Sequence, residues 1–289
     1  MTRTSKTLIP AVPPLTIARA ALEERLAESL TRRLTTVVAG AGFGKTTLLA
    51  GWGERVGSAW YTIDRRDMTL ATLAYGLAVA LRRRVPGLPP YLSEAPSRPG
   101  GEDVGRAAAL AAHVSEALQE LLEEDLVLVL DDVQELDPAS PSARLVEGLC
   151  RHAPERLHLV LCSRSELPFP IERLRGRGQV LELDSAALAF TWAETRRLFR
   201  SVLGEEGAEL ASPIHERTGG WPAAIRLALE ALRAAGENRR TDVLDRLSRP
   251  EGPIFAYLAG EVFQREPPAV RELLRRVAPF DRFTTDLCR

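Results

Sequence analysis

Apolar positions along the chain change their spacing several times, and up to residue 184 this pattern predicts strands that alternate with helices. Short, mainly apolar segments with the pattern of strands lie at 34–38, 58–63, 126–132, 157–162 and 179–183. Helical spacing of apolar residues predicts helices at 15–30, 45–54, 69–84, 102–124 and 140–152. Strands that alternate with helices form parallel sheets, so the predicted fold class is α/β, a five-stranded parallel sheet with helices on both faces.

After residue 184 only helical patterns follow. Thr191 and Glu194 have the spacing of a capping box, which predicts a helix that stops at Gly204. Further helices are predicted at 212–218, 222–235, 241–248, 253–265 and 268–277. Proline and glycine are frequent at 85–101, which predicts a loop. The predicted organisation is an N-terminal arm (1–14), a sheet domain (15–184) and a helical domain (185–240), with residues 241–289 after them.

The first predicted strand leads into a glycine-rich segment, Ala39-Gly40-Ala41-Gly42-Phe43-Gly44-Lys45-Thr46-Thr47. It fits the phosphate-binding pattern G-x-x-x-x-G-K-[ST], except that Ala39 takes the first glycine position. Gly42 and Gly44 can adopt positive φ, so the backbone N–H groups can turn towards a phosphate. Lys45 would reach the β- and γ-phosphates, and Thr46 would hold Mg²⁺. The candidate nucleotide-binding residues of this loop are Gly40, Ala41, Gly42, Phe43, Gly44, Lys45, Thr46 and Thr47.

An ordinary glycine-rich turn is the alternative interpretation of this loop. The chain has 38 Lys and Arg residues, and only Lys6 and Lys45 are lysines. A compact ammonium fits between phosphates where a planar guanidinium does not. The lysine at position 45 therefore favours phosphate binding.

Polar residues follow two of the predicted strands. Asp131 and Asp132 end the strand at 126–132, and Arg164 follows the strand at 157–162. Ligands of open α/β sheets bind at the carboxyl ends of the strands, so Asp131 is a candidate Mg²⁺ ligand and Asp132 a candidate to orient the attacking water. The strand before Arg164 should lie beside the phosphate-loop strand, which would place Arg164 near the γ-phosphate. The alternatives are a turn role for the carboxylates, as for Asp64, and a surface position for the arginine.

Composition limits which classes of protein the chain can belong to. Hydrophobic residues make up 45% of the 289 residues and the formal net charge is −1, which fits a globular protein without a general affinity for nucleic acid. The three cysteines and four histidines have no metal-ligand spacing, and Cys150 and Cys162 are predicted to be core residues of a reducing compartment. Apolar runs are too short to span a membrane and no apolar signal segment is visible, so a cytoplasmic location is expected.

Together these motifs resemble the STAND class of P-loop NTPases, and within it the large LuxR-type regulators typified by the maltose-regulon activator. The matching segments are Ala39–Thr47, Ala59–Asp64, Leu128–Asp132, Cys162–Arg164, Phe190–Thr191 and Glu216–Ala223. The resemblance implies a domain that binds ATP or ADP with Mg²⁺, a helical domain, and the start of a winged-helix domain at 241–289.

The resemblance also implies two further contacts with the base. The turn Gly220-Trp221-Pro222 would bring the helical domain onto the adenine, which makes Pro222 a candidate nucleotide-binding residue. The segment around Ile17 to Arg19 would close the base pocket, although Ala18 departs from the Gly or Pro usual in that family.

Further domains are expected beyond this chain, namely inducer-binding repeats and a DNA-binding domain. The chain stops at residue 289, inside the expected winged helix, which suggests a truncated fragment. Direct DNA binding and membrane association are not expected of this chain, whereas self-association on activation is.

Three functions are compatible with the sequence. The favoured one is a slow ATPase switch that serves as the nucleotide-binding module of a transcriptional regulator. A metabolic P-loop kinase, or another small-molecule NTPase, would usually need an arginine-rich lid and an acceptor pocket, whereas the helices after residue 185 are typical of a packed helical domain. A scaffold that binds nucleotide without hydrolysing it is the third.

Overall fold

The computed structural model describes residues 5–89, 103–235, 240, 260, 263–265 and 267–278 of the chain. It divides into two compact units, Met1–Ala189 and Phe190–Arg289, called here the sheet unit and the helical unit. The boundary lies a few residues after the predicted domain end at 184. Most of the helices predicted at 241–248 and 253–265, and most of the predicted loop at 85–101, lie outside the described residues.

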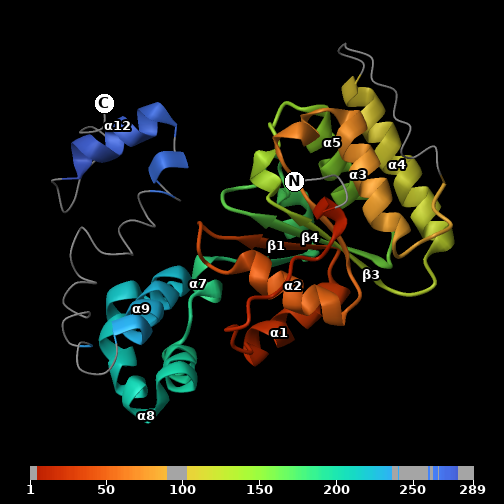
Figure 1. The fold of residues 1–289 in the computed structure, drawn as a ribbon. Helices are drawn as coiled ribbons and strands as arrows, with labels where there is room; N and C mark the ends of the chain where they lie inside the picture. Colours follow the sequence, from red (N-terminus) through yellow and green to blue (C-terminus); the bar gives the residue numbers. More distant parts are fainter. Residues whose placement is uncertain are drawn as a thin grey trace. The chain divides into compact units, whose positions relative to one another are not determined.

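Five parallel strands form the centre of the sheet unit, as predicted from the apolar runs (Figure 1). They are β1 (Leu34–Val38), β2 (Ala59–Thr62), β3 (Leu126–Asp131), β4 (Leu157–Ser163) and β5 (Val180–Leu183). Their order is β2-β3-β4-β1-β5, so β1 lies between β4 and β5. In register, Val38 lies opposite Ser163 and Thr62 opposite Asp131, which brings the carboxyl ends of the strands to one edge.

Helices cover both faces of this sheet. They are α1 (Ala20–Ala27), α2 (Lys45–Arg55), α3 (Leu70–Arg82), α4 (Asp103–Leu121) and α5 (Pro141–His152), with the short α6 (Glu172–Arg175) and α7 (Ser185–Leu188). Figure 1 shows α3, α4 and α5 on one side of the sheet and α1 and α2 on the other. The alternation along β3 explains this, because Leu128 and Leu130 belong to the core under α3–α5, whereas Val127 and Val129 belong to the core under α1 and α2.

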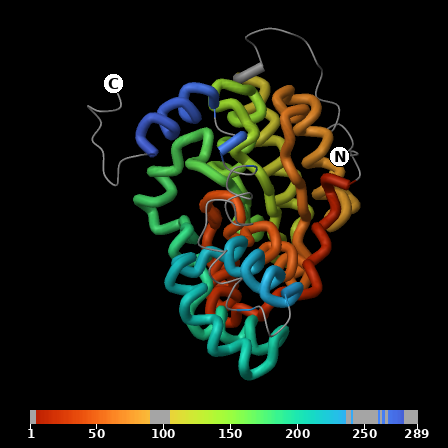
Figure 2. The backbone as a smooth tube through the Cα atoms, turned by 60° about the vertical axis from the view of Figure 1, so that its left-hand side comes forward, coloured from red at the N-terminus to blue at the C-terminus, as the bar shows by residue number. Residues whose placement is uncertain are grey.

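The N-terminal segment, predicted as an extended arm, packs against the sheet unit. Its short 3₁₀ helix η1 (Ser5–Thr7) contacts β2 and α3, and Figure 2 shows the segment running beside α3. Ile9 and Val12 pack against the core under α1 and α2. Lys6 is buried and pairs with two aspartates, so this lysine has a structural role that composition alone did not predict.

The helical unit contains α8 (Trp192–Thr218), α9 (Pro222–Ala235), the 3₁₀ helix η8 (Phe263–Arg265) and α12 (Pro268–Val277). The predicted capping box of Thr191 and Glu194 is present, and Gly204 interrupts α8 with φ 78° and ψ −168°. The prediction that a new helix begins at Ser212-Pro213 is wrong, because helix resumes directly after Gly204 and Pro213 lies inside it. The strong helix formers Glu205, Glu206 and Ala208–Ala211 outweigh the local cost of the proline.

Candidate functional site

The glycine-rich loop joins the end of β1 to the first turn of α2. Gly42 and Gly44 have φ values of 79° and 75°, the left-handed conformation predicted for them. Gly44 is the N-cap of α2, and no atom of its surroundings lies within 4 Å of the position that a Cβ would take. The first N–H groups of a helix have no partner within it and carry the positive end of its dipole. The loop thus has the open, donor-rich backbone that binds phosphate in such turns.

Lys45 is the first residue of α2 and directly follows Gly44 of this loop. Its Nζ donates hydrogen bonds to the carbonyl oxygens of Ala39 at 2.7 Å and Gly40 at 3.0 Å. The residue is buried, and burial lowers the pKa of its ammonium. Its hydrogen-bond partners among the described residues are neutral carbonyls, so the charge lacks a contacting anion there. A phosphate would supply that anion.

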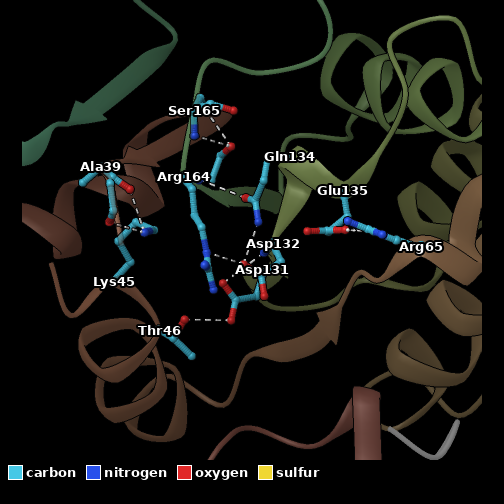
Figure 3. Close-up of polar contacts among 12 residues, drawn as sticks. Ala39, Lys45, Thr46, Arg65, Asp131, Asp132, Gln134, Glu135, Arg164 and Ser165 are labelled. Carbon is cyan, nitrogen blue, oxygen red and sulfur yellow. Dashed lines mark hydrogen bonds and ion pairs between the residues drawn. The ribbon is translucent and has the colours of Figure 1, made fainter. Parts of the chain in front are cut away.

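Thr46 and Asp131 meet across the gap between α2 and β3. The Thr46 hydroxyl donates a hydrogen bond to Asp131 Oδ2 at 2.9 Å (Figure 3). Asp131 is 2% exposed, and burial raises the pKa of its carboxyl. A hydroxyl and a carboxylate are hard oxygen ligands, the kind that Mg²⁺ prefers, and Mg²⁺ at nucleotide sites takes its other ligands from phosphate and water. The predicted pair therefore fits a magnesium ion without a larger protein cage.

Cys162 lies beneath this pair and was predicted only as a core residue. Its buried thiol lies close enough to Asp131 for the two groups to interact electrostatically. Burial raises the pKa of the thiol well above its ordinary value, so Cys162 stays neutral. Because β3 pairs with β4, Cys162 in β4 lies beside Asp131, the last residue of β3.

Asp132 and Arg164 also lie together at this edge. Asp132 has φ 59° and ψ 42°, and among the described residues it is the one non-glycine with positive φ. The Nε of Arg164 lies 3.6 Å from Asp132 Oδ1. Figure 3 shows the Arg164 side chain extending from the end of β4 towards Asp131 and Asp132. The structure thus brings the two predicted carboxylates and the predicted arginine to one place.

Gln134 belongs to this group and was missed from the sequence. Its Nε2 donates to Asp132 Oδ1 at 2.8 Å, and its Oε1 accepts from the backbone N–H of Arg164 at 2.9 Å. It lies in a 3₁₀ helix, η5 (Val133–Glu135), that was not predicted either. A polar residue two positions after Asp132 looks like any loop residue, so no local signal marks it.

Arg19 contacts the chain near the boundary of the two units. It is 9% exposed, and its guanidinium donates to the carbonyl oxygens of Leu188 at 2.7 Å and Ala189 at 2.8 Å. These bonds hold the end of α7. Its predicted contact with the base stays a prediction.

Pro222 and Asp64 each lie at the start of a helix. Pro222 is the first residue of α9 in the helical unit, and its predicted nucleotide contact stays a prediction. Asp64 forms a capping box with Asp67 at the 3₁₀ helix η3 (Arg65–Met68), which is the turn role considered for it.

Two kinds of feature are absent from the described residues. No group of three or more His, Cys, Asp or Glu residues there could hold a metal ion. No helix of the described part of the chain is long and apolar enough to cross a membrane.

Known proteins with similar sequences support the motif resemblance. The chain is 31% identical over 269 residues to the serine/threonine-protein kinase PknK of Mycobacterium tuberculosis, covering 89% of this chain and 23% of PknK. It is 31% identical over 266 residues to the HTH-type transcriptional regulator MalT of Serratia proteamaculans, covering 90% of this chain and 28% of MalT. The chain thus spans about a quarter of the length of these relatives.

A solved structure supports the fold. The Walker-type ATPase paby2304 of Pyrococcus abyssi matches 95% of this chain and 83% of its own length, with a TM-score of 0.55 and 15% identity. Residues 16–162, which include the loop, Asp131, Asp132 and Gln134, match the family described as AAA ATPase domain. The chain therefore belongs to the AAA ATPase domain family.

Proposed function

We propose that this chain is an ATP- and ADP-binding switch with slow Mg²⁺-dependent hydrolysis, the regulatory nucleotide-binding module of a larger signal-transducing transcriptional regulator. The observation that carries the proposal is the pairing of Thr46, next to the phosphate-loop lysine, with Asp131 across a 2.9 Å hydrogen bond. The two residues come from α2 and β3, 85 positions apart in sequence. An ordinary glycine-rich turn would not require a buried carboxylate opposite it.

Each residue has a distinct part in this proposal. The loop 40–47 binds phosphates through its backbone, and Lys45 neutralises their charge. Thr46 and Asp131 hold Mg²⁺, which when bound offsets the charge on the phosphate oxygens. Asp132 orients the attacking water, and Arg164 distinguishes ATP from ADP at the γ-phosphate.

The regulatory part of the proposal rests on similarity. MalT is an HTH-type transcriptional regulator, and both MalT and PknK are several times longer than this chain. We expect the further domains of such a regulator outside this chain, self-association on activation, and no specific DNA binding by the chain alone. In this scheme the exchange of ADP for ATP shifts a population between two conformations.

Nucleotide affinity tests the site directly. Lys45→Ala should weaken ADP binding by at least about tenfold, because a charge-assisted hydrogen bond to a phosphate is worth ~1.5–3 kcal/mol. Isothermal titration calorimetry measures this, with Arg173→Ala on exposed α6 as a control that also removes one positive charge. Equal affinities of wild type and Lys45→Ala would overturn the phosphate-loop assignment.

Single-turnover assays with labelled ATP separate the three functions considered above. A switch releases phosphate slowly and without an acceptor. A metabolic kinase transfers it only when an acceptor molecule is present. A scaffold binds ATP and leaves it intact.

A further inference from the structure

The side chain of Gln134 connects the ends of two neighbouring strands. It follows β3 by three residues, and it contacts one group from each strand end. Its amide N–H donates to the Asp132 carboxylate at 2.8 Å, and its amide oxygen accepts from the Arg164 backbone at 2.9 Å. Both distances are in the range of good hydrogen bonds.

The two bonds have opposite polarity, and this explains the residue type. A carboxylate can only accept hydrogen bonds and a backbone N–H can only donate, so a bridge between them needs a donor and an acceptor. The neutral amide of glutamine supplies both. A glutamate at this position could accept from Arg164 but would repel Asp132, and a leucine could do neither.

The side chains of Asp132 and Arg164 have only a weak contact with each other, although the Asp132 backbone is held by hydrogen bonds with Asp131 and Glu135. Asp132 has a left-handed backbone, which costs free energy for a non-glycine residue, and its side chain is 32% exposed. The Arg164 side chain is 36% exposed and lies 3.6 Å from Asp132, at the long end of an ion pair. Exposed ion pairs of this kind contribute little by themselves.

We propose that Gln134 is the positioning residue of this ATPase site, which sets Asp132 relative to Arg164. The inference rests on the proposed function, because it gives Asp132 the attacking water and Arg164 the γ-phosphate. In this scheme Gln134 contacts neither the attacking water nor the γ-phosphate. It fixes the carboxylate through one bond and the strand end that carries the arginine through the other.

Two variants separate the two bonds. Gln134→Leu removes both, and Gln134→Glu keeps the acceptor for Arg164 while it removes the donor for Asp132. Gln119→Leu on the exposed face of α4 is the matched control, since it makes the same chemical change away from the site. All variants are made in the full 289-residue chain.

The first measurement needs no nucleotide. Amide hydrogen exchange at Arg164 should become at least about tenfold faster in Gln134→Leu and stay near wild type in Gln134→Glu and Gln119→Leu, because exchange reports loss of the acceptor. Wild-type protection of this amide in Gln134→Leu would overturn the bridge.

The second measurement uses ATP and ADP. Both Gln134 variants should slow single-turnover hydrolysis by about tenfold or more, as expected for misplacement of a water-orienting group. The affinity for ADP should stay within about twofold of wild type, because the loop backbone and Lys45 hold the phosphates common to both nucleotides. A wild-type rate in both variants, or an equal loss of ADP affinity, would contradict the positioning role.

These readouts keep the inference separate from the proposed function. If wild type binds both nucleotides without hydrolysing ATP, the proposed ATPase fails. The ratio of ATP to ADP affinities then decides on Gln134, and it should change at least about threefold in Gln134→Leu because Arg164 reads the γ-phosphate. An unchanged ratio would overturn the inference.

Discussion

Asp131 combines low exposure with a proposed role, Mg²⁺ binding, that requires charge. The residue is 2% exposed, and its carboxylate accepts hydrogen bonds from the Thr46 hydroxyl at 2.9 Å and from the backbone N–H of Asp132 at 3.1 Å. Burial nevertheless raises its pKa, because removal from water disfavours the ionised form. A buried carboxylate of this kind lowers the stability of the folded chain as long as no cation is bound. Functional positions often lose stability in exchange for activity in this way.

Asp131→Asn should make the nucleotide-free chain more stable at pH 7. The folded-state pKa of Asp131 is raised, so its ionised form lowers stability as pH rises from the unfolded value of about 3.9 through the higher folded value. Asparagine lacks this dependence, and the stability difference should shrink as pH falls towards about 4. Urea unfolding at both pH values measures it.

The same variant should lose hydrolysis by about a hundredfold or more, since a bound metal contributes several kcal/mol to such reactions. Lower stability than wild type at pH 7 would contradict the argument from burial. Hydrolysis at the wild-type rate would mean that another residue holds the metal.

At the scale of elements, the pairing of α4 with α5 depends on small residues at their contact. A Cβ added to Gly148 of α5 would lie 2.6 Å from Ala111 Cβ of α4. Neither Cβ atom can move unless its backbone moves too. The two helices can therefore lie this close only because residue 148 has no side chain. These two helices, with α3, form the cover of one sheet face.

Gly148→Ala should therefore destabilise the chain by about 1–3 kcal/mol, the usual cost of overpacking. Gly105→Ala is the matched control. Gly105 is exposed in α4 with no atom within 4 Å of its Cβ position, so the same change there should stabilise by ~0.5–1 kcal/mol through helix propensity. Urea unfolding curves of both variants measure the difference. Equal effects at the two glycines would show that the helices can move apart at no cost.

At the scale of the whole molecule, the N-terminal segment is fastened to the sheet unit by buried charges. Lys6 Nζ lies 2.7 Å from Asp64 Oδ1 and 2.6 Å from Asp67 Oδ2. Asp67 is fully buried and also accepts from the Tyr61 hydroxyl at 2.8 Å. The network joins residue 6 to the segment that follows β2, so two parts of the chain about sixty residues apart depend on each other.

Lys6→Met should cost about 3–5 kcal/mol of stability, because it leaves the buried Asp67 carboxylate without its cation. Arg65→Met is a suitable control. The Arg65 side chain is 92% exposed, and its ion pair with Glu135 is long, at 3.5 Å. Its loss should therefore change stability by less than about 1 kcal/mol. Thermal and urea unfolding measure both variants. A Lys6→Met variant as stable as the control would show that the segment is not held by this network.

The sequence by itself determined the features that depend on residues close to one another along the chain. Short, mainly apolar segments marked all five strands, most clearly β3 and β4, because a strand buried on both faces needs apolar residues on both. Gly42 and Gly44 marked the loop, because positive φ is costly for other residues. The helix predicted at 140–152 begins at Pro141 with Ser140 as its N-cap, and these helix-start residues are a local signal of the same kind.

Tertiary structure decided the features that depend on which strands become neighbours. Gln134 reaches Arg164, and Cys162 reaches Asp131, only because β3 pairs with β4. Lys6 becomes a buried partner of Asp67 only when the N-terminal segment folds back onto β2. Strand order is set by the packing of the whole sheet with its helices, and side-chain contacts between distant segments leave no periodic signal in the sequence.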